Sequence, residues 1–389
     1  MRSQRSQRHA VDGPLVWFGG MVEHCLDHAR ARIKRGGHVV GMACEYTPRE
    51  LIMAAGGVPV CLCGGDADMI PAAEEMLPSN LCPLIKSTFG YSVRRENPFL
   101  EMAELVVAET TCDGKKKMYE LMAESRPVHV MELPQKPGDQ DAMRHWVREL
   151  HKLKEVLEER FKKRITGSGL RKAIALMNRE RGLRRDLAGL MKAEVPPITG
   201  LELLGMKSII SCIPSDLAQY RRALKVLPGR ILKPSARSRT RVLLTGVPIP
   251  HGAERVVGLI ENSGGLVVCQ ENCTGLKPIL EDVDAAAPDP MLAIAGKYFH
   301  LPCSVMTRND RRLDSLHELV RDFRPQCVVE VIWQACLTYD VESFRVKRLA
   351  GELGLPYLRI ETDYSPSDSA RIETRVQALF ETVRGRYKS

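Results

Sequence analysis

Cysteine is the residue type in this chain whose number and spacing most clearly suggest chemistry. The 389 residues contain twelve cysteines, and six of them form two sets of three: Cys44, Cys82 and Cys112, then Cys273, Cys303 and Cys336. The intervals are 38 and 30 residues in the first set and 30 and 33 in the second. Most of the six stand at or just beyond the end of an apolar, strand-like run, where an open α/β sheet exposes side chains to a crevice. Thiols gathered there predict a metal centre, and their number favours an iron–sulfur cluster over one zinc ion.

A free cysteine can also simply fill core space, because it is among the most buried residue types. That interpretation suits the cysteines that lie inside helical or strand patterns, namely Cys25, Cys61, Cys212 and Cys327. It does not suit Cys112 and Cys336, since each follows a strand and precedes a helix start, where the helix dipole favours a thiolate. Cys273 stands in a similar place, between a strand and the turn at Thr274-Gly275. We therefore interpret these three as ligands.

Other templates for metal binding or catalysis are missing from the sequence. Structural zinc sites usually contain C-x2-C pairs, whereas the close pairs here are Cys61-x-Cys63 and Cys269-x3-Cys273. Ferredoxin-type cysteine runs are also missing. There is no G-x-S-x-G, no P-loop, no G-x-G-x-x-G and no H-E-x-x-H motif. Any ATP chemistry is therefore expected to belong to a partner.

The composition indicates a globular protein with room for two or three domains, since 44% of the residues are apolar. The net charge of +9 can favour anionic partners, but 5% aromatics and no nucleic-acid signature argue against DNA or RNA. No run of 18 apolar residues is present, and the basic N-terminus lacks a secretory signal. We expect a cytoplasmic protein with reduced or metal-bound thiols, and no membrane association.

The elements that must position these thiols form two similar α/β units. Apolar runs predict strands at residues 38–44, 58–63, 105–111 and 128–133 in the first unit, and at 241–247, 266–270, 327–333 and 357–362 in the second. Thr47 and Glu50 predict a capping box for the helix after the first strand. Near-continuous apolar strands that alternate with helices are typical of parallel sheets covered on both faces.

The fold class predicted is α/β, with two Rossmann- or flavodoxin-like parallel-sheet domains and a helical segment between them. The helical segment is indicated by apolar residues three and four apart, such as Leu170, Ile174 and Met177. We divide the chain into a basic N-terminal tail at 1–20, a first α/β domain at 21–139, the helical segment at 140–226, a linker at 227–240 and a second α/β domain at 241–389.

Five motifs carry a resemblance to a known family: CEYTPRELIMAAGGVPV, NLCPLIKS, ETTCDGKKKMYE, ENCTG and QACLTYDVES. At these positions the chain resembles the benzoyl-CoA reductase/2-hydroxyacyl-CoA dehydratase subunit superfamily, and more closely its double-cubane cluster protein branch. The resemblance runs from about residue 20 to the C-terminus.

The resemblance implies a ligand set. In the dehydratases, cysteines matching Cys82, Cys112 and Cys336 hold one [4Fe-4S] cluster, whose open iron site binds the substrate thioester carbonyl. In the double-cubane branch six thiolates hold an [8Fe-9S] cluster, and Cys44, Cys273 and Cys303 would complete the set. Cys63 remains an alternative to Cys44. It stands at the end of the second strand of the first unit, and Cys273 follows the corresponding strand of the second unit.

The resemblance also implies partners and a reaction. A homodimeric ATPase with its own [4Fe-4S] cluster would supply low-potential electrons, and the chain itself would be a homodimer that reduces small molecules. The alternatives are a 2-hydroxyacyl-CoA dehydratase subunit with one [4Fe-4S] cluster, and a non-enzymatic bilobal α/β binding protein with structural zinc. Lys86, Lys115 and Asn272 lie near proposed ligands and are candidates for tuning the cluster, although both lysines could equally be solvated surface residues.

Overall fold

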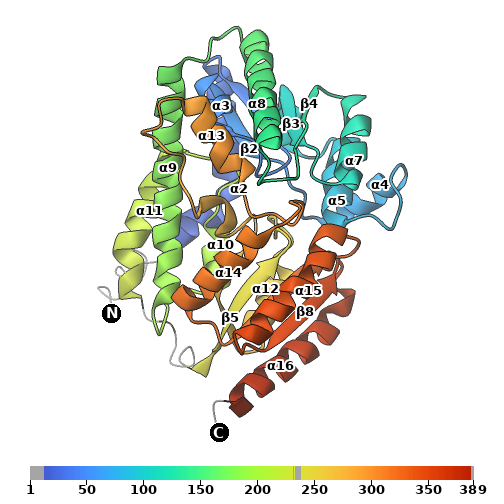
Figure 1. The fold of residues 1–389 in the computed structure, drawn as a ribbon, viewed down its shortest axis with the longest axis vertical. Helices are drawn as coiled ribbons and strands as arrows, with labels where there is room; N and C mark the ends of the chain where they lie inside the picture. Colours follow the sequence, from blue (N-terminus) through green and yellow to red (C-terminus); the bar gives the residue numbers. More distant parts are fainter. Residues whose placement is uncertain (1–12, 231, 233–237, 387–389) are drawn as a thin grey trace.

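The computed structural model describes residues 13–230, 232 and 238–386, and its core is two four-stranded parallel sheets (Figure 1). The first sheet has the order β2-β1-β3-β4, and its strands are β1 His38–Met42, β2 Gly57–Cys61, β3 Leu105–Glu109 and β4 Val128–Met131. The second has the order β6-β5-β7-β8, and its strands are β5 Thr240–Gly246, β6 Gly265–Glu271, β7 Cys327–Trp333 and β8 Tyr357–Thr362. Both orders are flavodoxin-like, and each places a topological switch point between its two inner strands. The predicted fold class is confirmed.

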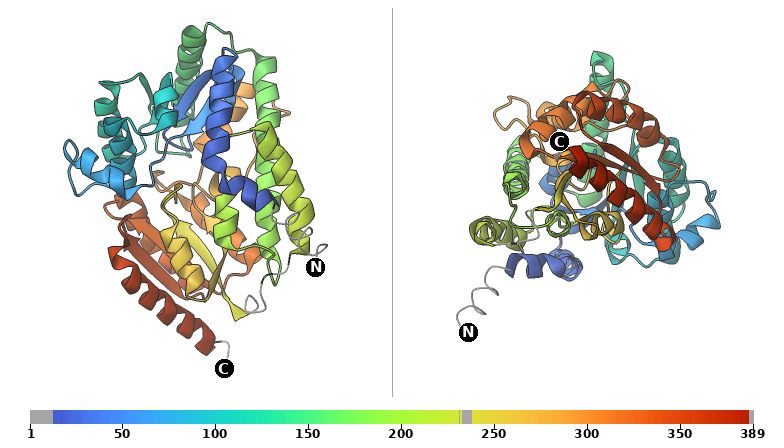
Figure 2. Two further views of the ribbon diagram at one scale, coloured as in Figure 1. Left: turned by 180° about the vertical axis from the view of Figure 1, so that it is seen from behind. Right: turned by 90° about the horizontal axis from the view of Figure 1, so that it is seen from below.

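Helices cover both faces of both sheets. On the first sheet, α2 packs on the side chain of Val39 and α8 packs on that of Val40, because neighbouring strand residues point to opposite faces. Figure 2 shows α2 (blue) on the back of the molecule as Figure 1 presents it. On the second sheet, α12 and α16 pack on one face, and α14 and α15 on the other. This double coverage explains why the strands read as near-continuous apolar runs.

The helices of the first half are α2 Met21–Lys34, α3 Arg49–Ala54, α4 Ile70–Glu74, α5 Pro83–Arg94, α6 Pro98–Met102 and α7 Asp113–Ala123. The middle of the chain forms α8 Gln140–Phe161, α9 Gly167–Gly189, α10 Gly200–Gly205 and α11 Pro214–Val226. The second half contains α12 Arg255–Asn262, α13 Pro290–Phe299, α14 Asp310–Phe323, α15 Leu337–Glu352 and α16 Ser369–Arg386. Short 3-10 helices are η1 Ala67–Met69, η2 Leu190–Lys192, η3 Leu227–Gly229, η5 Lys277–Ile279 and η6 Pro366–Asp368. None of these described helices combines the length and apolar composition needed to cross a bilayer.

The two halves interlock rather than merely touch. Although α13 belongs to the second half, it lies beside α8 and α9 at the first sheet (Figure 1). There Phe299 packs in one core with Trp146 and Val40. A second core joins the inner strands of the two sheets. In the loops that follow β2 and β5, Gly65 lies so close to the His251 carbonyl that any Cβ would stand 2.2 Å from its oxygen. The crevice between the halves is therefore held by packing on several sides.

All eight predicted strands are present, but those of the first sheet end two residues earlier than predicted. Two of the residue pairs concerned, Ala43-Cys44 and Thr110-Thr111, are small or β-branched, and the other two are Leu62-Cys63 and Glu132-Leu133. The first residue of three of these pairs still donates a backbone hydrogen bond to a neighbouring strand, Ala43 to Val107, Leu62 to Met42 and Thr110 to Met131, before the chain leaves the sheet.

The predicted capping box at Thr47 and Glu50 is wrong. Helix α3 begins after Pro48 with no side-chain cap. The Thr47 hydroxyl donates instead to Glu109, and the fully buried Glu50 carboxylate pairs with Arg181 at 2.6 Å. Because both side chains bind residues distant in sequence, neither is free to cap the helix.

The predicted tail and linker fall partly outside the described residues, which exclude 1–12, 231 and 233–237. Residues 13–19 of the predicted tail are helical, and Phe18 is 3% exposed. Residues 13–19 of the predicted basic tail are therefore an ordered part of the fold. Trp17 supports this segment, because its indole N–H donates to Asp216 at 2.9 Å.

Candidate metal centre

The six proposed ligands lie between the halves, on loops and helix starts near the carboxyl ends of the strands. Cys44 and Cys273 each follow a strand by two residues, and Cys112 and Cys336 each follow one by three. Cys82 and Cys303 lie in the long segments that join the second and third strands of each unit. Their mutual electrostatic contacts divide the six thiols into two groups of three.

The first group, which we name the helix-cap triad, comprises Cys82, Cys112 and Cys336. Each of these residues is the N-cap of a helix: Cys82 of α5, Cys112 of α7 and Cys336 of α15. A helix N-terminus presents free backbone N–H groups and the positive end of the helix dipole. Three such termini therefore converge on one set of thiols and favour negative charge there.

The proton affinities of the helix-cap triad reflect close thiol contacts. A hydrogen bond with Cys336 lowers the pKa of Cys82, and the same contact raises the pKa of Cys336 well above its usual range. Cys82 is therefore the more acidic thiol of this pair. Burial raises the pKa of Cys112.

The second group, which we name the inner triad, comprises Cys44, Cys273 and Cys303. Burial raises the pKa of Cys44, and that of Cys273 to about 11. Both thiols also feel the negative charge that a neighbouring Cys303 thiolate would carry. No helix begins at these three residues, so cations must supply the stabilisation of negative charge.

Hydrogen bonds hold the loops of the two triads together. Lys207 Nζ lies 3.2 Å from Glu45 and 3.2 Å from the Cys273 carbonyl oxygen, which joins the Cys44 and Cys273 loops. The Ser304 hydroxyl, next to Cys303, lies 3.0 Å from the hydroxyl of Thr338, two residues beyond Cys336. The triads are therefore neighbours with a fixed relation to each other.

Lys115 stands where the triads meet. Its Nζ donates to the Ala43 carbonyl at 3.0 Å. Burial alone would lower the pKa of Lys115, but the surrounding acidic groups, with Cys44 first and Cys112 among them, raise it well above its usual range. The Lys115 side chain thus keeps a positive charge next to thiols of both groups.

The other two residues proposed to tune the cluster, Lys86 and Asn272, have different surroundings. Lys86 is buried rather than solvated, and its Nζ is occupied by Glu74 and the Ser79 carbonyl, each at 2.7 Å. Asn272 is fully buried, and its Oδ1 accepts N–H bonds from Thr274 and Gly275. Asn272 thereby shapes the turn that presents Cys273.

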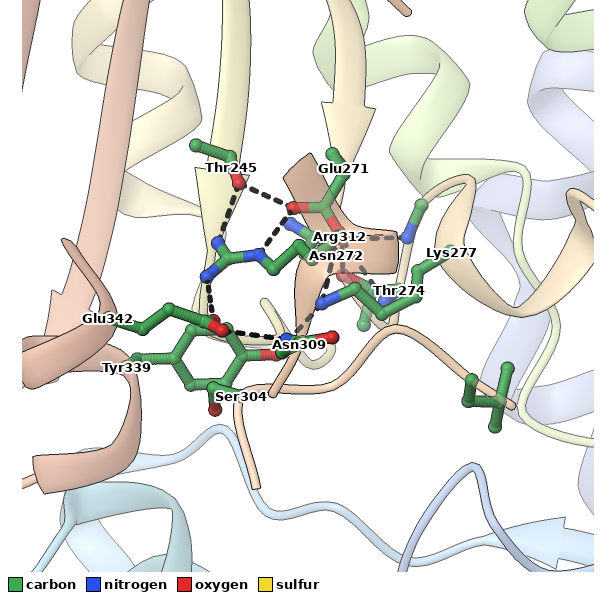
Figure 3. A network of polar contacts seen from close by, with 12 residues as sticks. Thr245, Glu271, Asn272, Thr274, Lys277, Ser304, Asn309, Arg312, Tyr339 and Glu342 are labelled. Atoms are coloured by element: carbon green, nitrogen blue, oxygen red, sulfur yellow. Dashed lines mark hydrogen bonds and ion pairs between the residues drawn. The ribbon is translucent and has the colours of Figure 1, made fainter. Parts of the chain in front are cut away.

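A buried ion network supports the inner triad from the second sheet (Figure 3). Arg312 on α14 is fully buried and contacts three carboxylates: Glu271 of β6 at 3.3 Å, Glu330 of β7 at 3.1 Å and Glu342 of α15 at 2.5 Å. It also donates to the Thr245 hydroxyl of β5 at 2.9 Å. Arg312 therefore ties together the strand ends and the helix that carry Cys273 and Cys336.

Lys277 and Tyr339 extend this network toward the thiols. Lys277 Nζ lies 3.1 Å from Glu271 and donates to the Tyr339 hydroxyl at 3.0 Å. Burial raises the pKa of Tyr339 well above its usual range, and nearby Cys273 and Cys303 raise it further. The phenol thus stays protonated at the edge of the inner triad.

A cavity of about 650 Å³ opens beside the inner triad. Its polar lining includes four thiols and two ammonium groups, which belong to Cys44, Cys61, Cys63, Cys273, Lys115 and Lys207. Its apolar wall comes from the N-terminal helices, α10 and the loop after β5, and includes Phe18, Met21, Leu204 and Ile249. This volume lies in the range of small-molecule sites.

The interpretation of Cys61 as core filler is wrong. Cys61 borders the cavity, and a hydrogen bond with Cys63 lowers the pKa of Cys61 to about 6, while that of Cys63 is raised. The C-x-C spacing at a strand end was the available signal, because residues two apart on a strand point to the same face. Cys25, Cys212 and Cys327 are buried, as expected of core residues.

Within the described ranges, no three His, Cys, Asp or Glu side chains are close enough to share a single metal ion. The fit to an iron–sulfur cluster rests instead on donor chemistry. Thiolates are the usual ligands of such clusters, and each cubane corner left for the protein takes one thiolate. Two adjacent groups of three thiols, one stabilised by helix N-termini and one by lysines, fit that demand.

The fold and the site together define a two-sheet α/β protein whose thiol groups meet between its halves. Residues 44–383 match the family model described as 2-hydroxyglutaryl-CoA dehydratase, D-component, and the chain belongs to this family. Its relatives include "Putative dehydratase subunit YjiM" of Escherichia coli (strain K12), which is 42% identical over 361 residues, 90% of this chain and 92% of that protein.

More distant relatives carry two kinds of name. A benzoyl-CoA reductase subunit of Thauera aromatica is 24% identical over 297 residues, which cover 75% of each chain. The (R)-phenyllactyl-CoA dehydratase beta subunit of Clostridium sporogenes is 21% identical over 374 residues, 94% of this chain and 97% of that one. This chain is therefore an enzyme subunit of the 2-hydroxyacyl-CoA dehydratase/benzoyl-CoA reductase type.

Proposed function

We propose that this chain is an iron–sulfur reductase with a double-cubane [8Fe-9S] cluster, which takes low-potential electrons from a partner ATPase and reduces small molecules. The observation that carries the proposal is the meeting of six thiols in two adjacent groups of three. A pair of cubanes that share one bridging sulfide needs three outer ligands each. Reduced thiols of this kind need a reducing compartment, so we propose the cytoplasm as the location.

In this proposal the helix-cap triad holds one cubane and the inner triad holds the other. Cys44 is preferred over Cys63 as the sixth ligand, because Cys44 lies close enough to Cys273 and Cys303 for their charges to raise its pKa, whereas the main contact of Cys63 is its hydrogen bond with Cys61. Once bound, the cluster supplies one-electron transfer at a potential set by its charge, hydrogen bonds and solvent exposure.

The protein's own groups set that environment. The N-termini of α5, α7 and α15 stabilise negative charge on one side, and Lys115 and Lys207 do so on the other. Arg312 and its carboxylates hold the strand ends in place. The cavity would bring a small substrate to the inner triad, with apolar side chains along one wall.

Because the sequence has no phosphate-binding loop, hydrolysis of ATP is assigned to a partner. That partner is proposed as a homodimeric ATPase with its own [4Fe-4S] cluster, which acts as activator of a homodimer of this chain. The +9 net charge would assist association with an acidic partner surface.

The test is reduction of a small substrate with a triple or double bond by anaerobically purified protein. With dithionite alone we expect slow turnover or none, and with the cognate ATPase and MgATP we expect reduction to begin. If the ATPase leaves the redox state of the cluster unchanged, the assignment fails.

A second candidate function is a 2-hydroxyacyl-CoA dehydratase subunit with one [4Fe-4S] cluster. It is favoured by the relatives named as dehydratase subunits and by the helix-cap triad, which could hold one cubane by itself. Dehydration of a 2-hydroxyacyl-CoA and dependence on a non-identical partner subunit would support this function over the first.

A further inference from the structure

Helix α15 carries a row of apolar side chains on its solvent side. Leu337 is 72% exposed, Val341 is 76% exposed and Phe344 is 70% exposed. Residues four and three apart lie on one face of a helix, so the three side chains form a continuous stripe. We name these three residues the α15 stripe.

The fold itself does not require the α15 stripe. The inward face of the same helix already supplies the core contacts, through Tyr339, Val346 and Ala350, which are all buried. An outward face with no packing role would ordinarily be polar. A contiguous exposed apolar patch on a protein surface usually marks an interaction site.

The α15 stripe begins at the proposed cluster. Leu337 directly follows the helix-cap residue Cys336, and Phe344 lies about 12 Å along the helix from it at 1.5 Å per residue. The helix between them is fixed from inside by Tyr339, which accepts from Lys277, and by Glu342, which pairs with Arg312. In Figure 1 the N-terminal end of α15 lies next to α5, another helix that starts at a proposed ligand.

We propose that the α15 stripe is the docking surface for the electron-donating ATPase. This inference rests on the function proposed above and adds the place where its partner binds. An electron donor must bring its own redox centre close to the acceptor, and the α15 stripe is an exposed apolar surface that adjoins the proposed ligand Cys336. Two charged residues on the rim are paired within the chain, Asp340 with Arg359 and Arg345 with Asp310, so apolar contact is the main source of affinity in this proposal.

The size of the stripe fits a transient partner better than a permanent one. Each side of a stable interface contributes about 800 Å² and roughly 20–30 residues, whereas weak electron-transfer complexes use smaller surfaces. A stripe of three apolar side chains matches the small surfaces of weak electron-transfer complexes. The alternative is that a second copy of this chain covers the α15 stripe, and the test below distinguishes this from binding of the ATPase.

The test uses the full-length, cluster-loaded chain with Phe344→Glu, alone and combined with Val341→Glu. Leu292→Glu on α13 is the matched control, since it places the same charge at another exposed apolar residue. Binding of the ATPase is measured by analytical ultracentrifugation with a non-hydrolysable ATP analogue, and cluster reduction is followed by its absorbance with MgATP. Iron content and the dithionite-reduced spectrum report whether the cluster is intact.

We expect the stripe variants to keep wild-type iron content while their dissociation constant for the ATPase rises at least tenfold, with Leu292→Glu unchanged. Unaltered ATPase binding by the double variant would overturn the proposal. So would conversion of a dimer of this chain to a monomer by these substitutions, because the stripe would then be covered by a second copy. If the ATPase binds the wild type through the stripe but delivers no electrons, the docking surface stands and the proposed reductase function fails.

Discussion

Replacing Arg312 with methionine removes a cation that contacts two fully buried carboxylates, Glu271 and Glu330, and the largely buried Glu342. In the wild type the guanidinium reaches Glu271, Glu330 and Glu342 at 2.5–3.3 Å, and Arg312 itself has no solvent exposure. Methionine fills much of the arginine volume, so the main change is electrostatic. Lys277 still compensates Glu271 at 3.1 Å, but the other two carboxylates lose their charged partner.

The expected cost follows from leaving charge buried without a counter-ion. Removal of one partner of a buried ion pair lowers the free energy of unfolding by about 3–5 kcal/mol. The loss should depend on pH. Burial already raises the pKa of Glu330, and Arg312 opposes that rise, so the variant's folded-state pKa increases further above the unfolded value. A raised carboxyl pKa stabilises the protein at low pH and is penalised as pH rises, so the deficit should be largest near pH 8 and smallest near pH 5.

Urea unfolding of anaerobically purified protein, followed by fluorescence at pH 5, 7 and 8, measures this cost. Arg345→Met is the control, because Arg345 pairs with the exposed Asp310 on the same pair of helices and its loss should hardly move the midpoint. Wild-type stability of Arg312→Met at pH 8, or a cost that does not change with pH, would show that the carboxylates do not depend on Arg312 for their charge.

Two further predictions concern the cysteines. Cys112→Ser should lose iron or convert its cluster, because a serine oxygen is a poorer ligand for iron–sulfur clusters, while Cys212→Ser should keep full iron; equal loss in both would indicate general misfolding. In cluster-free protein, labelling of Cys61 by iodoacetamide should rise through pH 6, since its pKa is about 6 and the thiolate reacts. Cys63→Ala should move that rise toward the ordinary thiol range, and mass spectrometry of the labelled peptides checks both statements; a wild-type profile that rises only above pH 8 would contradict the pKa assignment.

The parts of the fold that could be predicted are those encoded locally. Strands such as β7 are apolar along their whole length, because both faces of a parallel sheet are covered, and the prediction for 327–333 matches β7 residue for residue. The ends of β1 at Met42 and of β3 at Glu109 could not be placed, since nothing in the composition of the residues that follow distinguishes a strand from a loop. The prediction of a capping box was wrong for a related reason, because Glu50 pairs with Arg181, which lies 131 residues away in the sequence.

The residues of the site also divide into those that local sequence could predict and those that only the fold brings together. Cys112 and Cys336 were recognisable because a strand ends and a helix begins beside each of them, and both prove to be N-caps. The Arg312 network gave no signal, because its members come from three strands and two helices that are brought together only by the fold. Lys115 could be named from its closeness to Cys112, but its place between the two triads depends on tertiary packing.

The central claim is that six thiols of one chain hold a double-cubane cluster, and its most direct test is the iron and acid-labile sulfide content of anaerobically purified protein. We expect about eight irons and nine sulfides per chain, with no zinc. About four irons and four sulfides would contradict the double-cubane assignment and support a single cubane on the helix-cap triad. Zinc without sulfide would contradict the iron–sulfur account altogether.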